Sequence, residues 1–305
     1  MDNDSKIFVA GSNGLVGSAI KKKLEEYNYN NVYWVRRENC DLRNRVQVES
    51  YFLHSKPEYV FLSAAKVGGI GVNIKQPAEF LYDNLMIQSN IIDAAYRHGV
   101  KKLLFFGSAN TYPKECLKPI KEEYLLSGSL DESTEPYALA KIAGIKLCET
   151  YRKQYGCNFI SIQPSNVYGP TDNTKGHVIA TFIDKFHKAK INNEPVVKCW
   201  GSGVARREFI YADDLANASI FLMQNYDDYG IINVGSGEEI SIYDLAYKVA
   251  SLVGYRGNIE WDRSQPDGIV SKLLDTTKLS NLGWKPSTSL DEGLKLTYQH
   301  YKQEN

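Results

Sequence analysis

Short runs of apolar residues alternate along the first half of the chain with longer segments in which apolar residues return every three or four positions. Runs of about four to eight apolar residues are typical of strands buried on both faces of a sheet, and the longer spacing is typical of amphipathic helices. The runs that predict strands in this half are residues 7–10, 32–35, 40–42, 59–64, 103–108 and 158–163. Helices are expected after Gly14, from about 77 to 98 and around 137–141. This alternation predicts an α/β fold with a doubly wound parallel sheet and right-handed crossovers.

The pattern changes after Pro170, where prolines and a glycine interrupt the alternation. Short strands are expected at residues 196–200, 208–211 and 231–234, and helices at 177–190, 213–224, 241–253 and 289–301. We interpret this part as a smaller substrate domain from which the chain returns once to the first domain. The predicted dinucleotide-binding domain comprises residues 1–165 plus about 208–236, and the substrate domain comprises 166–207 plus about 237–305.

Composition narrows the classes of partner. The 305 residues contain 36 Lys and Arg against 36 Asp and Glu, so no general electrostatic attraction to nucleic acid or to a membrane surface is expected. The amino terminus is polar and no uninterrupted apolar stretch is long enough to cross a bilayer, so we expect a cytoplasmic protein. The five cysteines are scattered without metal-ligand spacing, which predicts free thiols and no metal site.

A glycine-rich turn follows the first expected strand. Gly11 permits a tight turn, Gly14 lets backbone N–H groups approach a pyrophosphate at the helix amino terminus, and Gly17 lets helix and strand pack closely. Glycines also collect in ordinary loops, but this position between strand and helix favours a dinucleotide site. Asn13 and Leu15 in the same turn are included in the predicted site.

The second expected strand ends in two arginines, Arg36 and Arg37, where an NAD-preferring protein would normally carry an acidic residue. Two guanidinium groups suit a 2′-phosphate, so we predict NADP(H), although Glu38 and the possibility of an exposed basic turn weigh against this. Asp41 and the adjacent Leu42 are placed to meet the adenine. Asp41 could instead cap the segment that begins at Arg43.

Two further segments lie where strands are expected to end. Ala64 ends the strand 59–64 and Ala65 begins the glycine-containing loop that follows, and ligands in such sheets bind at the carboxyl ends of strands. Ser108 ends the strand 103–108.

Tyr137 and Lys141 lie four residues apart, so on a helix their side chains point into the same cleft. An ammonium there favours the phenolate form of the tyrosine, and Ser108 can donate a hydrogen bond to the same reacting oxygen. This arrangement suits a proton donor for carbonyl reduction. On spacing alone, surface or packing roles for these two residues are more frequent.

These features together resemble the extended short-chain dehydrogenase/reductases, a Rossmann-fold family, through Gly11-x-x-Gly14-x-x-Gly17, Tyr137-x-x-x-Lys141 and Ser108. Further segments spread over essentially the whole chain are similar to the GDP-L-fucose synthase family. These segments are residues 64–70, 135–149, 166–170, 200–203, 207–209 and 272–275.

The resemblance implies a substrate, a cofactor and binding residues. In that family NADPH reduces carbon 4 of a GDP-linked 4-keto-6-deoxy sugar after epimerisation at carbons 3 and 5. By similarity, Tyr137 would deliver a proton to the carbonyl oxygen, which Ser108 polarises. The residues implied to line the nicotinamide are Pro164, Asn166 and Val167, and those implied to hold the GDP-sugar are Lys185, Trp200, Arg207 and Asp275. Surface ion pairs and a core tryptophan are the alternatives for the second group. Relatives commonly form homodimers, so a homodimer is expected.

One position departs from the family pattern. The family epimerises with a cysteine two residues after the active-site serine and with a histidine, but here Asn110 occupies the cysteine position. An amide can hydrogen-bond to an enolate but cannot take or give its proton near neutral pH. His177 matches the family histidine, although it could bind cofactor or sugar without proton chemistry. Cys116 is expected to be inert.

The leading hypothesis is therefore an NADPH-dependent C4 ketoreductase of a GDP-linked keto hexose or heptose that has lost the epimerase activity. The alternatives are a bifunctional GDP-L-fucose synthase and a non-catalytic NADP or nucleotide-sugar binding protein. A 4,6-dehydratase is disfavoured, because Ala109 and Asn110 supply no carboxylate beside the Tyr137 helix.

Overall fold

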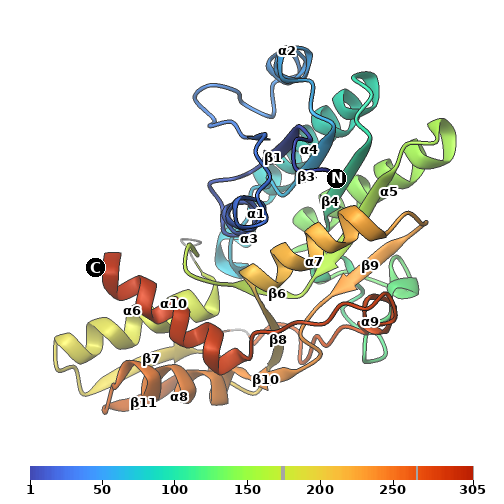
Figure 1. Cartoon of the computed structure of the whole chain (residues 1–305). Coiled ribbons are helices and arrows are strands. Elements are labelled where there is room, and N and C mark those ends of the chain that lie inside the picture. The colour runs from blue at the N-terminus through green and yellow to red at the C-terminus, as the bar shows by residue number, and fades with distance from the viewer. Residues whose placement is uncertain (173–175, 266, 305) are drawn as a thin grey trace.

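The computed structural model describes residues 1–172, 176–265 and 267–304, and its largest element is a six-stranded parallel sheet (Figure 1). The strand order is β2-β1-β3-β4-β5-β9. The chain adds β2 on one side of β1 and then adds β3 and the later strands on the other side, as in a doubly wound sheet. The strands are β1 (Ile7–Ala10), β2 (Val32–Tyr33), β3 (Tyr59–Leu62), β4 (Lys102–Phe106), β5 (Phe159–Pro164) and β9 (Ile231–Val234). The predicted fold class is confirmed.

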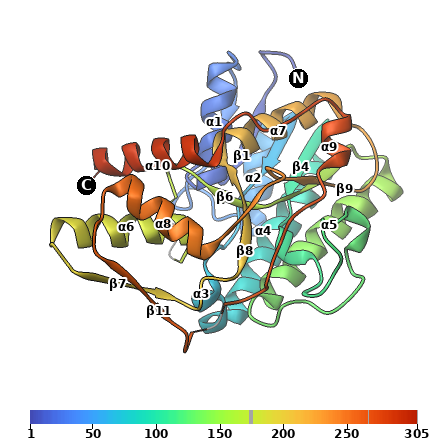
Figure 2. The same cartoon turned by 90° about the horizontal axis from the view of Figure 1, so that it is seen from below.

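Helices cover both faces of this sheet (Figures 1 and 2). Helices α1 (Leu15–Glu26) and α7 (Ala212–Asn225) pack together on one face, and α2 (Arg45–Ser55), α4 (Pro77–Arg97) and α5 (Glu135–Tyr155) cover the other. Successive strand residues point to opposite faces. In β1, for example, Ile7 and Val9 join the core beneath α1 while Phe8 and Ala10 join the core beneath α4.

Two smaller sheets lie beyond the carboxyl ends of the large one. One has the order β10-β8-β6 and the other pairs β11 with β7. Their strands are β6 (Asn166–Tyr168), β7 (Val196–Trp200), β8 (Arg206–Tyr211), β10 (Glu239–Ser241) and β11 (Asn258–Asp262). A separate core joins these sheets to three helices, α6 (Val178–Ile191), α8 (Ile242–Val253) and α10 (Leu290–Glu304). The short helices are α3 (Ile70–Lys75), α9 (Thr277–Asn281) and the 3₁₀ turns η1 (Ala109–Thr111) and η2 (Glu122–Tyr124).

The strand predicted at residues 40–42 is not formed. Asp41 instead accepts hydrogen bonds from the Arg43 backbone N–H and guanidinium, which holds this segment as a turn. Asp41 is not the helix cap either, because α2 begins at Arg45 and the Asn44 side chain accepts from its first N–H groups. The predicted strand 32–35 is shortened to Val32–Tyr33.

Two expectations drawn from composition can be compared with the structure. All five cysteines are free thiols, as predicted. Over the described ranges, none of the helices combines the length and the apolar character needed to cross a bilayer.

Candidate active site

A cavity of about 610 Å³ opens where β1, β3, β4 and β5 reach their carboxyl ends. Its wall includes the residues that directly follow these strands, at Gly11, Ser63, Gly107 and Ser165. Parallel strands all present their carboxyl ends at the same edge of the sheet, so residues far apart in sequence meet there. A volume of this size is within the range of small-molecule and cofactor sites.

The cavity brings together most of the residues predicted to bind cofactor. Those that line it are Gly11, Asn13, Gly14, Leu15, Gly17, Arg37, Asp41, Leu42, Ala64, Ala65, Lys141, Pro164, Asn166, Val167 and His177. Arg36 is exposed and is not part of the wall. The sequence reading missed Val16, Arg43, Lys66, Phe80, Asp83 and Ile87, which also line the cavity. Lys66 was detectable, because it directly follows the Ala64-Ala65 loop.

The glycine turn has the shape that a bound pyrophosphate requires. Gly11 has φ +91° and its missing β-carbon would lie 2.7 Å from the Ala64 backbone, so only glycine fits the turn. A β-carbon at Gly17 would overlap the Gly11 carbonyl oxygen. At Gly14 the nearest protein atom would be 3.4 Å away, so packing does not require glycine there. Gly14 and Leu15, at the amino terminus of α1, line the cavity, and phosphate binding beside them stays a prediction.

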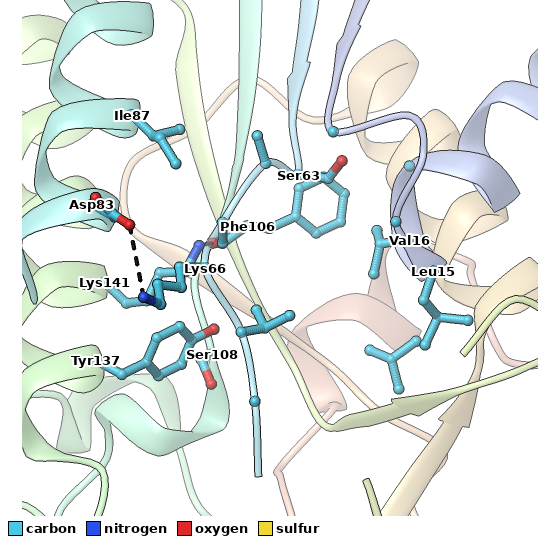
Figure 3. A pocket seen from close by; sticks show the side chains of 18 of the residues that line it. Leu15, Val16, Ser63, Lys66, Asp83, Ile87, Phe106, Ser108, Tyr137 and Lys141 are labelled. Carbon is cyan, nitrogen blue, oxygen red and sulfur yellow. Dashed lines mark hydrogen bonds and ion pairs between the residues drawn. The ribbon is translucent and has the colours of Figure 1, made fainter. Parts of the chain in front are cut away.

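Charged side chains form a connected group on the wall formed by the segment 37–43 and α4. The Arg43 guanidinium contacts Asp41 at 2.7 Å and Asp83 at 3.0 Å. The Lys66 ammonium lies 3.9 Å from Asp83 (Figure 3). The hydrogen bonds from Arg43 lower the pKa of Asp41 to about 2. Arg37 and Arg43, rather than Arg36 and Arg37, are therefore the guanidinium groups at the cavity.

Tyr137 and Ser108 meet at the cavity wall with their hydroxyl groups close together (Figure 3). Tyr137 is in the first turn of α5 and packs edge-on against the ring of Phe80. Burial raises the pKa of the Tyr137 phenol to about 12, and the hydrogen bond with Ser108 opposes this shift. The expected phenolate is therefore not favoured, and Tyr137 holds its proton at neutral pH.

Lys141 is one turn further along α5 and is almost fully buried. Its ammonium donates to the Phe106 carbonyl oxygen at 2.7 Å and lies 5.9 Å from the centre of the Tyr137 ring. Burial lowers the pKa of Lys141 to about 7. The four-residue spacing placed both side chains on the cavity wall, as predicted.

Asn110 and His177 also line the cavity. His177 directly precedes α6, and its Nδ1 lies 3.0 Å from both carboxylate oxygens of Asp172. A proton on Nδ1 is donated to that carboxylate, which leaves Nε2 for other partners. Asn110, on η1, accepts a hydrogen bond from the buried Lys272 at 2.5 Å.

The four residues expected to hold a GDP-sugar lie outside this cavity, as the described residues define it. Trp200 is 56% exposed, and its ring would be 3.7 Å from a β-carbon at Gly71 in α3. Arg207 donates to the Ile269 carbonyl oxygen at 2.5 Å. Lys185 donates to the Lys198 carbonyl oxygen, and Asp275 accepts from the Thr277 N–H. Their role in substrate binding stays a prediction.

Comparison with known proteins identifies the family to which the chain belongs. Residues 7–235 match the model of the NAD dependent epimerase/dehydratase family. The chain belongs to this family. The match covers all six strands of the large sheet and the whole cavity wall.

Relatives cover the chain from end to end. GDP-L-fucose synthase 1 of Arabidopsis thaliana is 48% identical over 98% of this chain and 94% of its own length. A GDP-6-OMe-4-keto-L-xylo-heptose reductase from C. jejuni has a TM-score of 0.96 at 37% identity and covers 100% of this chain and 99% of its own. The structure of a GDP-mannoheptose C4 reductase from Campylobacter jejuni with NADP bound has a TM-score of 0.93 at 39% identity, with 99% of both chains covered. The resemblance to the GDP-L-fucose synthase family is confirmed.

Proposed function

We propose that this protein is an NADPH-dependent reductase of the C4 ketone of a GDP-linked keto hexose or heptose, and that it lacks 3,5-epimerase activity. The observation that carries the proposal is the pair of hydroxyl groups, from Tyr137 and Ser108, at the edge of a cavity whose opposite wall is the glycine turn. Relatives described as GDP-sugar synthases and reductases, one of them with NADP bound, support the substrate class and the cofactor.

The proposed reaction uses three side chains, those of Tyr137, Ser108 and Lys141. NADPH, when bound, supplies the hydride. Tyr137 keeps its proton because burial disfavours the phenolate, and it donates that proton to the ketone oxygen as the oxygen gains charge. Ser108 donates a second hydrogen bond to the same oxygen. Lys141 adds a positive charge close to Tyr137, which stabilises the tyrosinate that proton transfer leaves behind.

Loss of epimerase activity rests on Asn110. Exchange of a proton at the carbons beside a ketone needs a group that both accepts and donates it. Asn110 lines the cavity two residues after Ser108, and its amide has no accessible pKa near neutrality. The expected result is that the protein catalyses no isotope exchange at carbons 3 and 5.

The test is incubation with GDP-4-keto-6-deoxymannose in deuterated water without NADPH, followed by mass spectrometry and NMR of the sugar. We expect no enzyme-dependent deuterium at carbons 3 and 5, and NADPH consumption when the cofactor is added. The variant Asn110→Cys is the positive comparison, because it restores a thiol at this position. Rapid exchange by the wild-type protein would refute the loss of the epimerase.

A bifunctional GDP-L-fucose synthase is the second candidate, and a specific observation favours it. His177 lines the cavity, and the contact of its Nδ1 with Asp172 leaves Nε2 as the ring nitrogen for proton transfer. The same exchange experiment decides between the two. A non-catalytic binding protein remains the candidate of another class, and NADPH oxidation with any GDP-linked keto sugar would dismiss it.

Three expectations remain part of the proposal. The division into a cofactor domain and a sugar domain can be examined by limited proteolysis with and without NADPH. The homodimer can be examined by light scattering of the purified protein. A cytoplasmic location can be examined by fractionation of cells that express it. The residue patterns and composition supply the first and third expectations, and the family resemblance supplies the homodimer.

A further inference from the structure

Lys272 reaches the active-site wall from a distant part of the chain. It belongs to the segment 272–275, which is held by hydrogen bonds to two other parts of the chain. The Leu273 carbonyl oxygen accepts from the Ile120 N–H at 2.7 Å, and the Leu274 N–H donates to the buried Glu208 carboxylate at 3.0 Å. The Lys272 side chain is only 9% exposed. A long flexible side chain is thereby held in one direction, toward η1 and its Asn110.

The hydrogen bond to Asn110 determines which way the amide faces. An ammonium group donates hydrogen bonds and cannot accept them, so the atom of Asn110 that meets Lys272 is the oxygen. The backbone N–H of Asn110 is engaged with the Ser108 Oγ at 3.2 Å. This leaves the amide nitrogen Nδ2, with its two N–H groups, as the end of the Asn110 side chain that can donate to a ligand in the cavity that Asn110 lines.

The protonation state of Lys272 allows it to donate this hydrogen bond to Asn110. Burial and the nearby Arg207 lower the pKa of Lys272 to about 8, while Asp131 acts in the opposite direction. Most of the population is therefore protonated at pH 7 and keeps its donors. The contact with Asn110 needs only that protonated form.

We propose that Lys272 is a positioning residue that locks Asn110 as a hydrogen-bond donor toward the sugar, at the hydroxyl oxygen on a carbon next to the ketone carbon. The inference rests on the proposed function, because it needs a keto sugar beside Ser108. Asn110 thus contributes to substrate binding and regiochemistry rather than to proton exchange. Lys272 itself does not contact the sugar.

The experiment measures KM and kcat for GDP-4-keto-6-deoxymannose, by NADPH absorbance, in a set of matched variants. Asn110→Ala removes the donor, and Lys272→Met frees the amide to rotate. Each is expected to raise KM about tenfold with kcat and the KM of NADPH unchanged, as for loss of one oriented hydrogen bond. Lys272→Arg supplies another donor-only cation and is expected to stay within about threefold of wild type.

The double variant separates positioning from stability. If Lys272 acts only through Asn110, Lys272→Met adds almost nothing in the Asn110→Ala background, so the double variant also shows about a tenfold higher KM. A structural role would lower activity equally in both backgrounds. Asn110→Asp keeps a side-chain oxygen for Lys272 but has no side-chain N–H, so it is also expected to raise KM. This variant tests the Asn110 N–H donor even if Lys272→Met does not fold. Lys278→Met is the control, because its ammonium reaches Tyr229 and Ile231 carbonyl oxygens instead.

The outcomes are distinct. Multiplicative losses in the double variant, or a wild-type KM in Lys272→Met or Asn110→Asp, would overturn the positioning role while leaving the reductase proposal intact. Absence of keto-sugar turnover by the wild-type protein would instead defeat the proposed function, and this inference with it.

Discussion

Replacement of Tyr137 by phenylalanine tests the reaction most directly. The phenol has a pKa of about 12, so at pH 7 about one molecule in 10⁵ is ionised and the proton is available for transfer. Removal of a positioned general acid typically costs about 10²- to 10⁴-fold in rate, which corresponds to roughly 3–5 kcal/mol in the barrier. Ser108 remains in Tyr137→Phe and still polarises the ketone, so the residual rate stays above zero.

The assay is single-turnover reduction of a GDP-linked keto sugar, with NADPH affinity measured separately by fluorescence titration. We expect the single-turnover rate constant to fall by the stated factor, with NADPH affinity and thermal stability close to wild type, because the lost hydroxyl faces the cavity. Tyr168→Phe is the matched control. Its hydroxyl lies outside the described cavity wall, 3.5 Å from the Leu290 carbonyl oxygen. A Tyr137→Phe protein with more than about a tenth of wild-type turnover would show that the proton comes from another group.

Three further predictions concern charge and packing. The pKa of Lys141 is about 7, so kcat/KM for reduction is expected to fall as pH rises through that value; a rate that stays flat from pH 6 to about 9 would contradict this role. Gly17→Ala forces a β-carbon onto the Gly11 carbonyl oxygen, so NADPH affinity is expected to fall at least about tenfold in a titration, and unchanged binding would contradict the tight turn. Burial raises the pKa of Glu208 from 4.5 to about 7, so its contribution to stability is present below pH 4.5 and is lost as pH rises toward 7. Glu208→Gln is therefore expected to gain roughly 3 kcal/mol relative to wild type over that interval in denaturant titrations, and a constant difference would refute it.

Local patterns were sufficient for the fold class and for much of the cavity wall. An apolar strand followed by Gly11, Gly14 and Gly17 predicts a phosphate-binding turn because the steric needs of that turn are local. The four-residue spacing of Tyr137 and Lys141 likewise places both on one side of a helix whatever surrounds it. Prediction failed where a neighbouring charge changed the local preference, as at Asp41, which pairs with Arg43 instead of joining a strand.

The sequence by itself determined the alternation of strands and helices that builds the large sheet, the glycine turn and the candidates for the reacting groups, because these depend on residues close together in the chain. Only the tertiary structure decided how far the pKa of Tyr137 is raised, since that depends on how completely the folded protein removes water from the phenol. It also decided which arginines face the cavity, and that Lys272 meets Asn110 across 162 positions. Contacts over such separations are set by how the sheets and helices pack, which no local pattern encodes.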